Sequence, residues 1–300
     1  MSRPVAILML LICTTLWGFA FVVQKSAMET MGPLTFIGVR NLLGGVAILP
    51  LAIFLTRRTQ RPQPLTRRQW WFIAVMSLAL MLGSWLQQVG LLTTTVTNGG
   101  FLTSLYVLLV PLIGLFVFRT WPHPVIWVGV PLALIGIYYL NGGGLDTLNI
   151  GDGFVVGSAV FWAIQVMMLG YIARTTSQPI LVSCISFLLA GGVALLAAFI
   201  FETPSITGIM GGWEELAYAG IFSTAIAFTL QAVGQQHLPS ANAAIILSSE
   251  SLFAALGGAI FLNERLPPIG YAGAALIFIA ILAVEALPPL WARRQAKLTN

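Results

Sequence analysis

Apolar segments, each about as long as one membrane span, follow one another along this chain and limit what it can fold into. Of its 300 residues, 58% are hydrophobic and 8% are charged, whereas a soluble domain carries about a quarter charged residues. Because the bilayer core has no water to bond the backbone, about 20 apolar residues cross it as a helix. The sequence therefore predicts an all-α integral membrane protein. Its ten transmembrane helices are predicted near residues 4–24, 33–55, 70–90, 96–117, 123–140, 151–173, 179–201, 214–236, 241–262 and 268–287.

The charged residues between these segments predict the orientation. One set of loops and ends carries most of the basic residues: Arg3, Arg57, Arg58, Arg61, Arg67, Arg68, Arg119, Arg174, Arg293, Arg294 and Lys297. The alternate set carries only Lys25 and Arg265, among most of the acidic residues. Lys and Arg mark cytoplasmic loops, so both termini are predicted to be cytoplasmic and the chain to lie in the cytoplasmic (inner) membrane. The net charge of +5 then reflects topology, and no nucleic-acid partner is expected.

A second copy of the sequence follows the first at a distance of 144 residues. The matching pairs include Gln87 and Gln231, Asn98 and Asn242, Ser104 and Ser248, Gly114 and Gly258, Pro124 and Pro268, and Gly129 and Gly273. The repeat predicts a five-helix unit over residues 1–145 (the first copy) and another over 146–300 (the second copy). Because five is odd, the second copy enters the membrane inverted. Inverted-topology repeats are typical of secondary transporters.

Residues 257–279 resemble the EamA family of the drug/metabolite transporter superfamily, and the resemblance extends over essentially the whole chain. Its motifs are Glu250, the Leu-Asn-Glu-Arg-Leu step at 262–266, and the tryptophans Trp17 and Trp162, each followed by a small residue. Ser251 departs from the family's usual proline, and Arg-Thr-Trp at 119–121 departs from a Glu-Arg step. The resemblance implies export of amino acids or other metabolites, and among its members we favour the YddG-type amino-acid exporters.

Two ionisable residues lie inside predicted spans. Glu250 is about ten residues into the ninth, where an ionised, unpaired carboxyl is costly. It either couples protons or binds an amine, or it is satisfied by neighbouring serines or another span. Arg40 lies in the second span and could bind a substrate carboxylate. We favour a structural role for Arg40, in which it snorkels outward or pairs with an acid such as Glu250.

Polar and aromatic residues recur at helical spacing in several spans and predict a central cavity, because polar stripes do not face lipid. Trp17 and Trp162 hold equivalent places in the two copies, and an indole face attracts an ammonium group. Hydrogen bonds between helices are the alternative for any single polar residue. The predicted cavity residues are Trp17, Phe21, Gln24, Ser84, Gln88, Phe101, Ser104, Trp162, Gln165, Phe228, Gln231 and Ser251.

Motifs of other function classes are absent from the sequence. There is no phosphate-binding Gly-Lys-Ser loop, no metal-ligand spacing around the two histidines, and no nucleophile–histidine–acid set. We therefore expect no enzyme activity, no cofactor and no metal. The predicted function is a secondary transporter that exports small metabolites, with amino acids favoured, through a cavity formed by spans 1–4 and 6–9. Its partners are a small-molecule substrate, the lipid bilayer and, as a candidate coupling ion, protons. The alternatives are an uncoupled facilitator, an exporter of other metabolites or drugs, and a membrane-embedded enzyme that acts on lipid.

Overall fold

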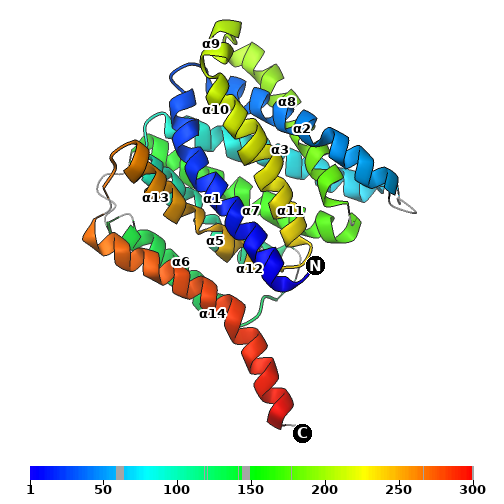
Figure 1. Ribbon diagram of the computed structural model, residues 1–300, viewed down its shortest axis with the longest axis vertical. Helices are drawn as coiled ribbons and strands as arrows, with labels where there is room; N and C mark the ends of the chain where they lie inside the picture. Colours follow the sequence, from blue (N-terminus) through cyan, green and yellow to red (C-terminus); the bar gives the residue numbers. More distant parts are fainter. Residues whose placement is uncertain are drawn as a thin grey trace.

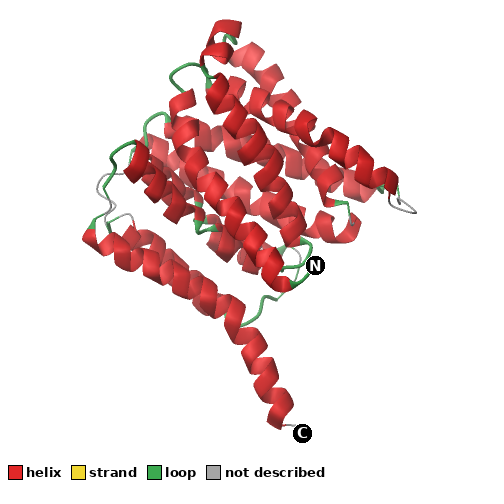
Figure 2. Cartoon of the chain, in the orientation of Figure 1, coloured by secondary structure: helices red, strands yellow, loops and turns green. Residues whose placement is uncertain are grey.

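Helices form all the regular secondary structure in the described part of the computed structural model (Figure 1; Figure 2). The structure describes residues 1–58, 64–117, 119, 121–140, 142–143, 149–176, 178–265 and 267–298. The helices are α1 (Arg3–Ala27), α2 (Pro33–Arg58), α3 (Arg67–Leu91), α4 (Val96–Thr103), α5 (Tyr106–Phe116), α6 (Ile126–Leu140), α7 (Ile150–Thr176), α8 (Pro179–Phe201), α9 (Ile206–Gly211), α10 (Trp213–Ala217), the π-helix η1 (Tyr218–Ala227), α11 (Phe228–Gln235), α12 (Ser240–Leu247), α13 (Glu250–Phe261) and α14 (Pro268–Leu298).

Eight helical segments of the described chain are long and apolar enough to cross a membrane. Two shorter apolar segments, Ile126–Tyr139 and Pro268–Val284, stand where the fifth and tenth spans are predicted. Large apolar side chains such as Phe199 and Ile200 are exposed on the outside of the bundle, where lipid tails would cover them. The prediction of an all-α membrane protein is confirmed, whereas ten spans and two cytoplasmic termini stay predictions.

Two of the expected spans contain a break in the helix that the sequence did not predict. The fourth is interrupted at Ser104 and Leu105, and the ninth at Ser248 and Ser249, positions 144 residues apart. At both breaks the backbone tightens to bonds between residues three apart, such as Leu105 N to Leu102 O at 3.3 Å. Serine hydroxyls bonded to nearby carbonyls favour such distortions. Ser104 Oγ also donates to the carbonyl of Ser248 at 3.2 Å, so the two breaks touch.

The helices of the two copies are interleaved. α2 packs against its counterpart α8, and α6 packs against its counterpart α14. α3 of the first copy packs against α7 of the second. The equivalent helices of the opposite copies, α1 and the pair η1 and α11, also pack against each other. The same contact is therefore made twice, with the roles of the two copies reversed. Glycines permit the close approach: a methyl group on Gly38 would lie 2.9 Å from Leu195 Cβ, and one on Gly191 would lie 2.8 Å from Leu42 N. α6 and α14 form a separate pair beside this bundle (Figure 1).

Each end of the bundle has its own chemical character. The acidic end is where α1, α3, α8 and α13 finish, and it carries acidic residues such as Glu202 and Glu264. The basic end carries arginines at the starts of α1 and α3, Arg3 and Arg67, and Arg58 at the end of α2. In Figure 1, α9 marks the acidic end, and the two chain termini lie toward the basic end.

Candidate functional site

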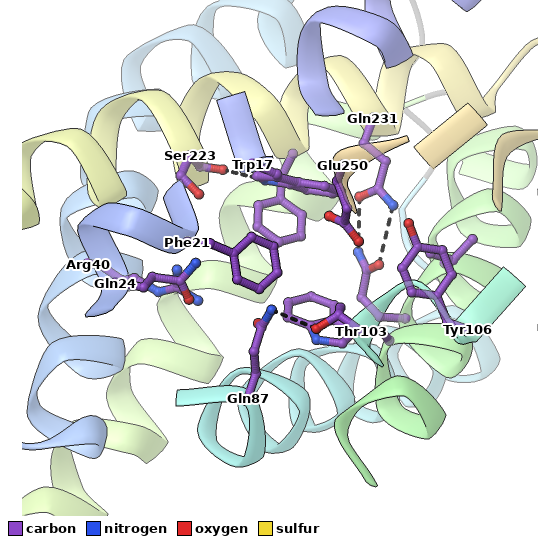
Figure 3. A pocket seen from close by; sticks show the side chains of 14 residues that line it. Trp17, Phe21, Gln24, Arg40, Gln87, Thr103, Tyr106, Ser223, Gln231 and Glu250 are labelled. Atoms are coloured by element: carbon purple, nitrogen blue, oxygen red, sulfur yellow. Dashed lines mark hydrogen bonds between the residues drawn. The ribbon is translucent and has the colours of Figure 1, made fainter. Parts of the chain in front are cut away.

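A cavity lies at the centre of the bundle, between helices of both copies (Figure 3). Its volume is about 30 Å³, which is room for water but not for a metabolite. A substrate therefore requires these helices to separate. The lining residues are Trp17, Phe21, Gln24, Arg40, Gln87, Thr103, Tyr106, Trp162, Gln165, Val166, Ser223, Phe228, Gln231 and Glu250.

Several polar atoms of the cavity wall are left without partners. Gln24 Oε1, Arg40 Nε, Tyr106 Oη, Trp162 Nε1 and Glu250 Oε1 are buried and have no hydrogen-bond partner among the described residues. Nearly all buried polar atoms in proteins are hydrogen-bonded to protein or water, because an unpaired one costs about 1–3 kcal/mol. The cavity is therefore lined with groups suited to bind a polar molecule.

Arg40 brings a positive charge to the cavity from α2. It is 3% exposed, and its Nη2 donates to Ser84 Oγ at 3.1 Å, while its guanidinium lies 5.4 Å from the Phe36 ring centre. Both partners are neutral. No ion pair joins Arg40 to Glu250 in the described structure. A buried guanidinium with only neutral partners is suited to receive an anion.

Glu250 brings a carboxyl group to another part of the cavity wall. It is the first residue of α13, directly after the helix break, and it is 4% exposed. The neighbouring serine hydroxyls donate elsewhere: Ser248 to Ile245 O at 2.8 Å, and Ser251 to Ser248 O at 2.8 Å. Its carboxyl is therefore not satisfied by these serines. The helix break therefore places this carboxyl at the start of α13, facing the cavity.

Aromatic rings form the remainder of the wall. Phe228 of α11 stands between the two tryptophans, with its ring centre 4.6 Å from that of Trp17 and 6.1 Å from that of Trp162. Trp17 is fixed in place because its Nε1 donates to the carbonyl of Ser223 at 3.0 Å. The two repeat-related tryptophans thus enclose one part of the cavity from α1 and α7, as their equivalence suggested.

The structure brings together most of the residues singled out in the sequence. Those that line the cavity are Trp17, Phe21, Gln24, Arg40, Trp162, Gln165, Phe228, Gln231 and Glu250. Five others are buried beside it and do not line it: Ser84, Gln88, Phe101, Ser104 and Ser251. The polar residues among them each make at least one bond to protein: Gln88 Nε2 donates to the Gln24 carbonyl at 2.7 Å, although Gln88 Oε1 has no described partner. Ser84, Gln88 and Ser104 bond to other spans, whereas Ser251 bonds to Ser248 O within its own span.

Sequence reasoning missed five lining residues: Gln87, Thr103, Tyr106, Val166 and Ser223. Gln87 Nε2 donates to Thr103 Oγ1 at 3.1 Å. The repeat carried the signal for Gln87, because a shift of 144 residues places it on Gln231, which lines the same cavity. Tyr106 follows the break in the fourth span, and its hydroxyl lies near the Glu250 carboxyl without reaching hydrogen-bond geometry.

Comparison with known proteins identifies the family. Two segments, residues 4–142 and 149–285, match the EamA-like transporter family. The chain belongs to this family. An uncharacterized transporter of Archaeoglobus fulgidus is 32% identical over 95% of this chain and 87% of its own length. The threonine/homoserine exporter RhtA of Escherichia coli is 29% identical over 59% of this chain and 58% of its own. One crystal structure matches 98% of this chain and 99% of its own with a TM-score of 0.76 at 19% identity, which supports the same fold.

These findings establish the class of this EamA-family protein. It is a multi-pass protein of the cytoplasmic membrane, and both the family and its relatives are transporters. Another relative, the uncharacterized inner membrane transporter YedA of Escherichia coli, is 25% identical over 90% of this chain.

Proposed function

We propose that this EamA-family protein is a secondary transporter that exports zwitterionic amino acids by alternating access. The observation that carries the proposal is the presence of a buried guanidinium and a buried carboxyl, not paired with each other, in one closed cavity. Arg40 and Glu250 are each at least 96% buried, and each keeps a polar atom without a described partner. A buried charge is expensive unless it is paired, so a ligand with both charges would satisfy both residues at once.

The arrangement of the wall suits such a ligand. In Figure 3 the ring of Phe21 stands between Arg40 with Gln24 on one side and Glu250 with Tyr106 on the other. A substrate carboxylate would bind at the first group and its ammonium at the second. The indole and phenyl rings nearby would accept an apolar or aromatic side chain and contribute cation–π attraction to the ammonium.

The interleaved copies support alternating access. The cavity is bounded by helices from both copies, and inverted repeats transport by rocking one arrangement against its mirror image. The hydrogen bond from Ser104 to Ser248 joins the two helix breaks, and the two copies would rotate about this contact. The name of RhtA as a threonine/homoserine exporter supports amino acids as the cargo and export as the direction.

The test is counterflow in proteoliposomes without any imposed gradient. Vesicles loaded with one unlabelled amino acid are placed in the same labelled amino acid at trace concentration, across a panel of amino acids. Transient accumulation for a subset of the panel is expected, and protein-free vesicles are the control. If no member of the panel exchanges, the amino-acid assignment is overturned and the panel passes to other metabolites. Product formation from lipid without exchange would instead favour a membrane-embedded enzyme.

Glu250 is also the candidate for proton coupling, because its carboxyl lies in the cavity with one oxygen unpartnered. Coupling predicts that an imposed proton gradient drives net transport by the wild type and not by Glu250→Gln. Gradient-independent net transport by both proteins would favour the uncoupled facilitator.

A further inference from the structure

Acidic residues are distributed unequally between the two copies. The chain has nine Asp and Glu residues, and Glu29 is the only one that precedes residue 146. Glu29 lies in the turn between α1 and α2, at the acidic end. The first copy therefore contributes no carboxylate to the basic end, whereas the second copy contributes several to the acidic end. This inequality matters because two inverted copies would otherwise build the same contacts at both ends.

Glu264 of the second copy bonds to the start of α4 in the first copy. Its Oε1 accepts from Val96 N at 3.1 Å and its Oε2 from Thr97 N at 3.0 Å. The Thr97 hydroxyl donates to the same Oε2. The backbone turns Glu264 into this position through Asn263, whose φ is +55°. Gly258 leaves the space, because a methyl group there would lie 2.6 Å from Glu264 Oε2.

Glu202 makes the same arrangement at the start of α2. Its two carboxylate oxygens accept from Leu34 N at 2.7 Å and from Thr35 N at 2.9 Å, and the Thr35 hydroxyl donates to Oε2 at 2.7 Å. Helix N-termini present free N–H groups and a positive dipole end to an anion. Both acids thus hold a first-copy helix by charge-assisted hydrogen bonds, the stronger kind of hydrogen bond.

Two more second-copy acids bond across the same end. Asp152 accepts from the Thr94 hydroxyl, and Glu215 accepts from the Ser26 hydroxyl at 2.8 Å. Lys25 adds a first-copy contact, since its Nζ donates to Thr94 O at 2.6 Å. The four carboxylates therefore join the second copy to three segments of the first: the end of α1, the start of α2, and residues 94–97 at the start of α4.

The basic end lacks the equivalent of the Glu264 contact. A shift of 144 residues places Thr120 at the position of Glu264, and Ser240 with Ala241 at the positions of Val96 and Thr97. Within the described structure, no carboxylate meets the start of α12. A cavity of about 430 Å³ lies there instead, lined by residues of both copies such as Trp121 and Ser240. A cavity of about 450 Å³ also lies at the acidic end, beside Glu202. The two ends therefore differ in the carboxylate bonds between the copies, which are described at the acidic end and not at the basic end.

We propose that these carboxylate bonds between the copies form a latch that keeps the acidic end closed in the substrate-free transporter, with Glu264 as its principal residue. Opening the acidic end separates the copies there and breaks the bonds. Opening the basic end breaks none of them. The unequal distribution of acids thus sets the resting conformation. The inference rests on the alternating-access mechanism, but it concerns the conformation and not the substrate.

The test measures distances between pairs of spin labels in the full-length protein in lipid nanodiscs, without substrate and with the native cysteines replaced. Labels at Leu92 and Arg265 report on the acidic end, and labels at Trp121 and His237 report on the basic end. The variants are Glu264→Gln, Glu264→Gln combined with Glu202→Gln, and Gly258→Ala. Gly258→Ala displaces the carboxylate without changing its charge. Glu214→Gln is the matched control, because Glu214 is exposed at the same end and has no described bond.

Each variant is expected to raise the ratio of long to short distances at the acidic end by about tenfold or more, the effect of losing one charge-assisted hydrogen bond. Glu214→Gln is expected to leave the ratio unchanged. Unchanged distances in Glu264→Gln, the double variant and Gly258→Ala would overturn the latch, as would an equal shift in the control. Because no substrate is added, this test of the latch is independent of the amino-acid assignment. If the variants open at the acidic end but the protein shows no amino-acid counterflow, only the amino-acid assignment is overturned.

Discussion

The two charges of the cavity predict a crossed pattern of ligand selectivity. The perturbations are Arg40→Gln, which replaces the guanidinium by a shorter neutral amide, and Glu250→Gln, which replaces the carboxyl by an amide of the same shape. The ligands are an amino acid, its decarboxylated amine and its deaminated acid, which for leucine are isoamylamine and 4-methylpentanoate. Arg40→Gln should weaken binding of the two carboxylates and spare the amine. Glu250→Gln should weaken binding of the two ammonium compounds and spare the acid.

The magnitude follows from the burial of the two side chains. Arg40 is 3% exposed and Glu250 is 4% exposed, so solvent screens neither interaction strongly. A hydrogen bond to a charged group contributes about 1.5–3 kcal/mol, and every 1.4 kcal/mol is a factor of ten in affinity. Each loss should therefore lie between about tenfold and 150-fold.

The assay is competition of each ligand against counterflow of a labelled amino acid, which gives an inhibition constant for all nine combinations of protein and ligand. Arg68→Gln and Glu214→Gln are the matched controls, because they make the same chemical changes at exposed positions outside the cavity. The reasoning is refuted if Arg40→Gln weakens isoamylamine as much as 4-methylpentanoate, or if the controls reproduce the losses.

Two further predictions concern packing and topology. A methyl group on Gly18 would lie 2.2 Å from Phe253 Cβ, so Gly18→Ala should lower the free energy of unfolding by about 1–3 kcal/mol. Gly192→Ala, which meets nothing within 4 Å, should not lower it; thermal unfolding in detergent compares the two, and equal losses would contradict the packing argument. A single cysteine at Glu29 should react with a membrane-impermeant maleimide in intact cells, whereas one at Arg57 should react only after permeabilisation. Labelling of both from outside would contradict the predicted orientation.

The class of the fold was predictable because its cause is local in the sequence. In lipid the backbone must bond within its own segment, so long apolar runs such as those in α7 and α8 fix their own secondary structure. The repeat singled out Trp17 and Trp162, and depth within a span singled out Glu250; all three line the cavity. These inferences needed no knowledge of which helices are neighbours.

The choice among adjacent polar residues was not predictable. Gln87 lines the cavity whereas Gln88 bonds to the Gln24 carbonyl, although both are glutamines in the same turn of α3. Successive residues of a helix point about 100° apart, so the rotation of α3 against its neighbours decides which one faces the centre. Packing against α7 and α8 sets that rotation.

The sequence by itself determined that this protein is a helical membrane protein with a repeated structure, because burial in lipid and backbone hydrogen bonding act along each segment separately. Only the tertiary structure decided which polar groups face a common cavity, where the fourth and ninth spans break, and that Glu264 and Glu202 bond the two copies at one end. Those features depend on contacts such as that between Glu264 and Thr97, which lie 167 residues apart in the chain and meet only when the copies interleave.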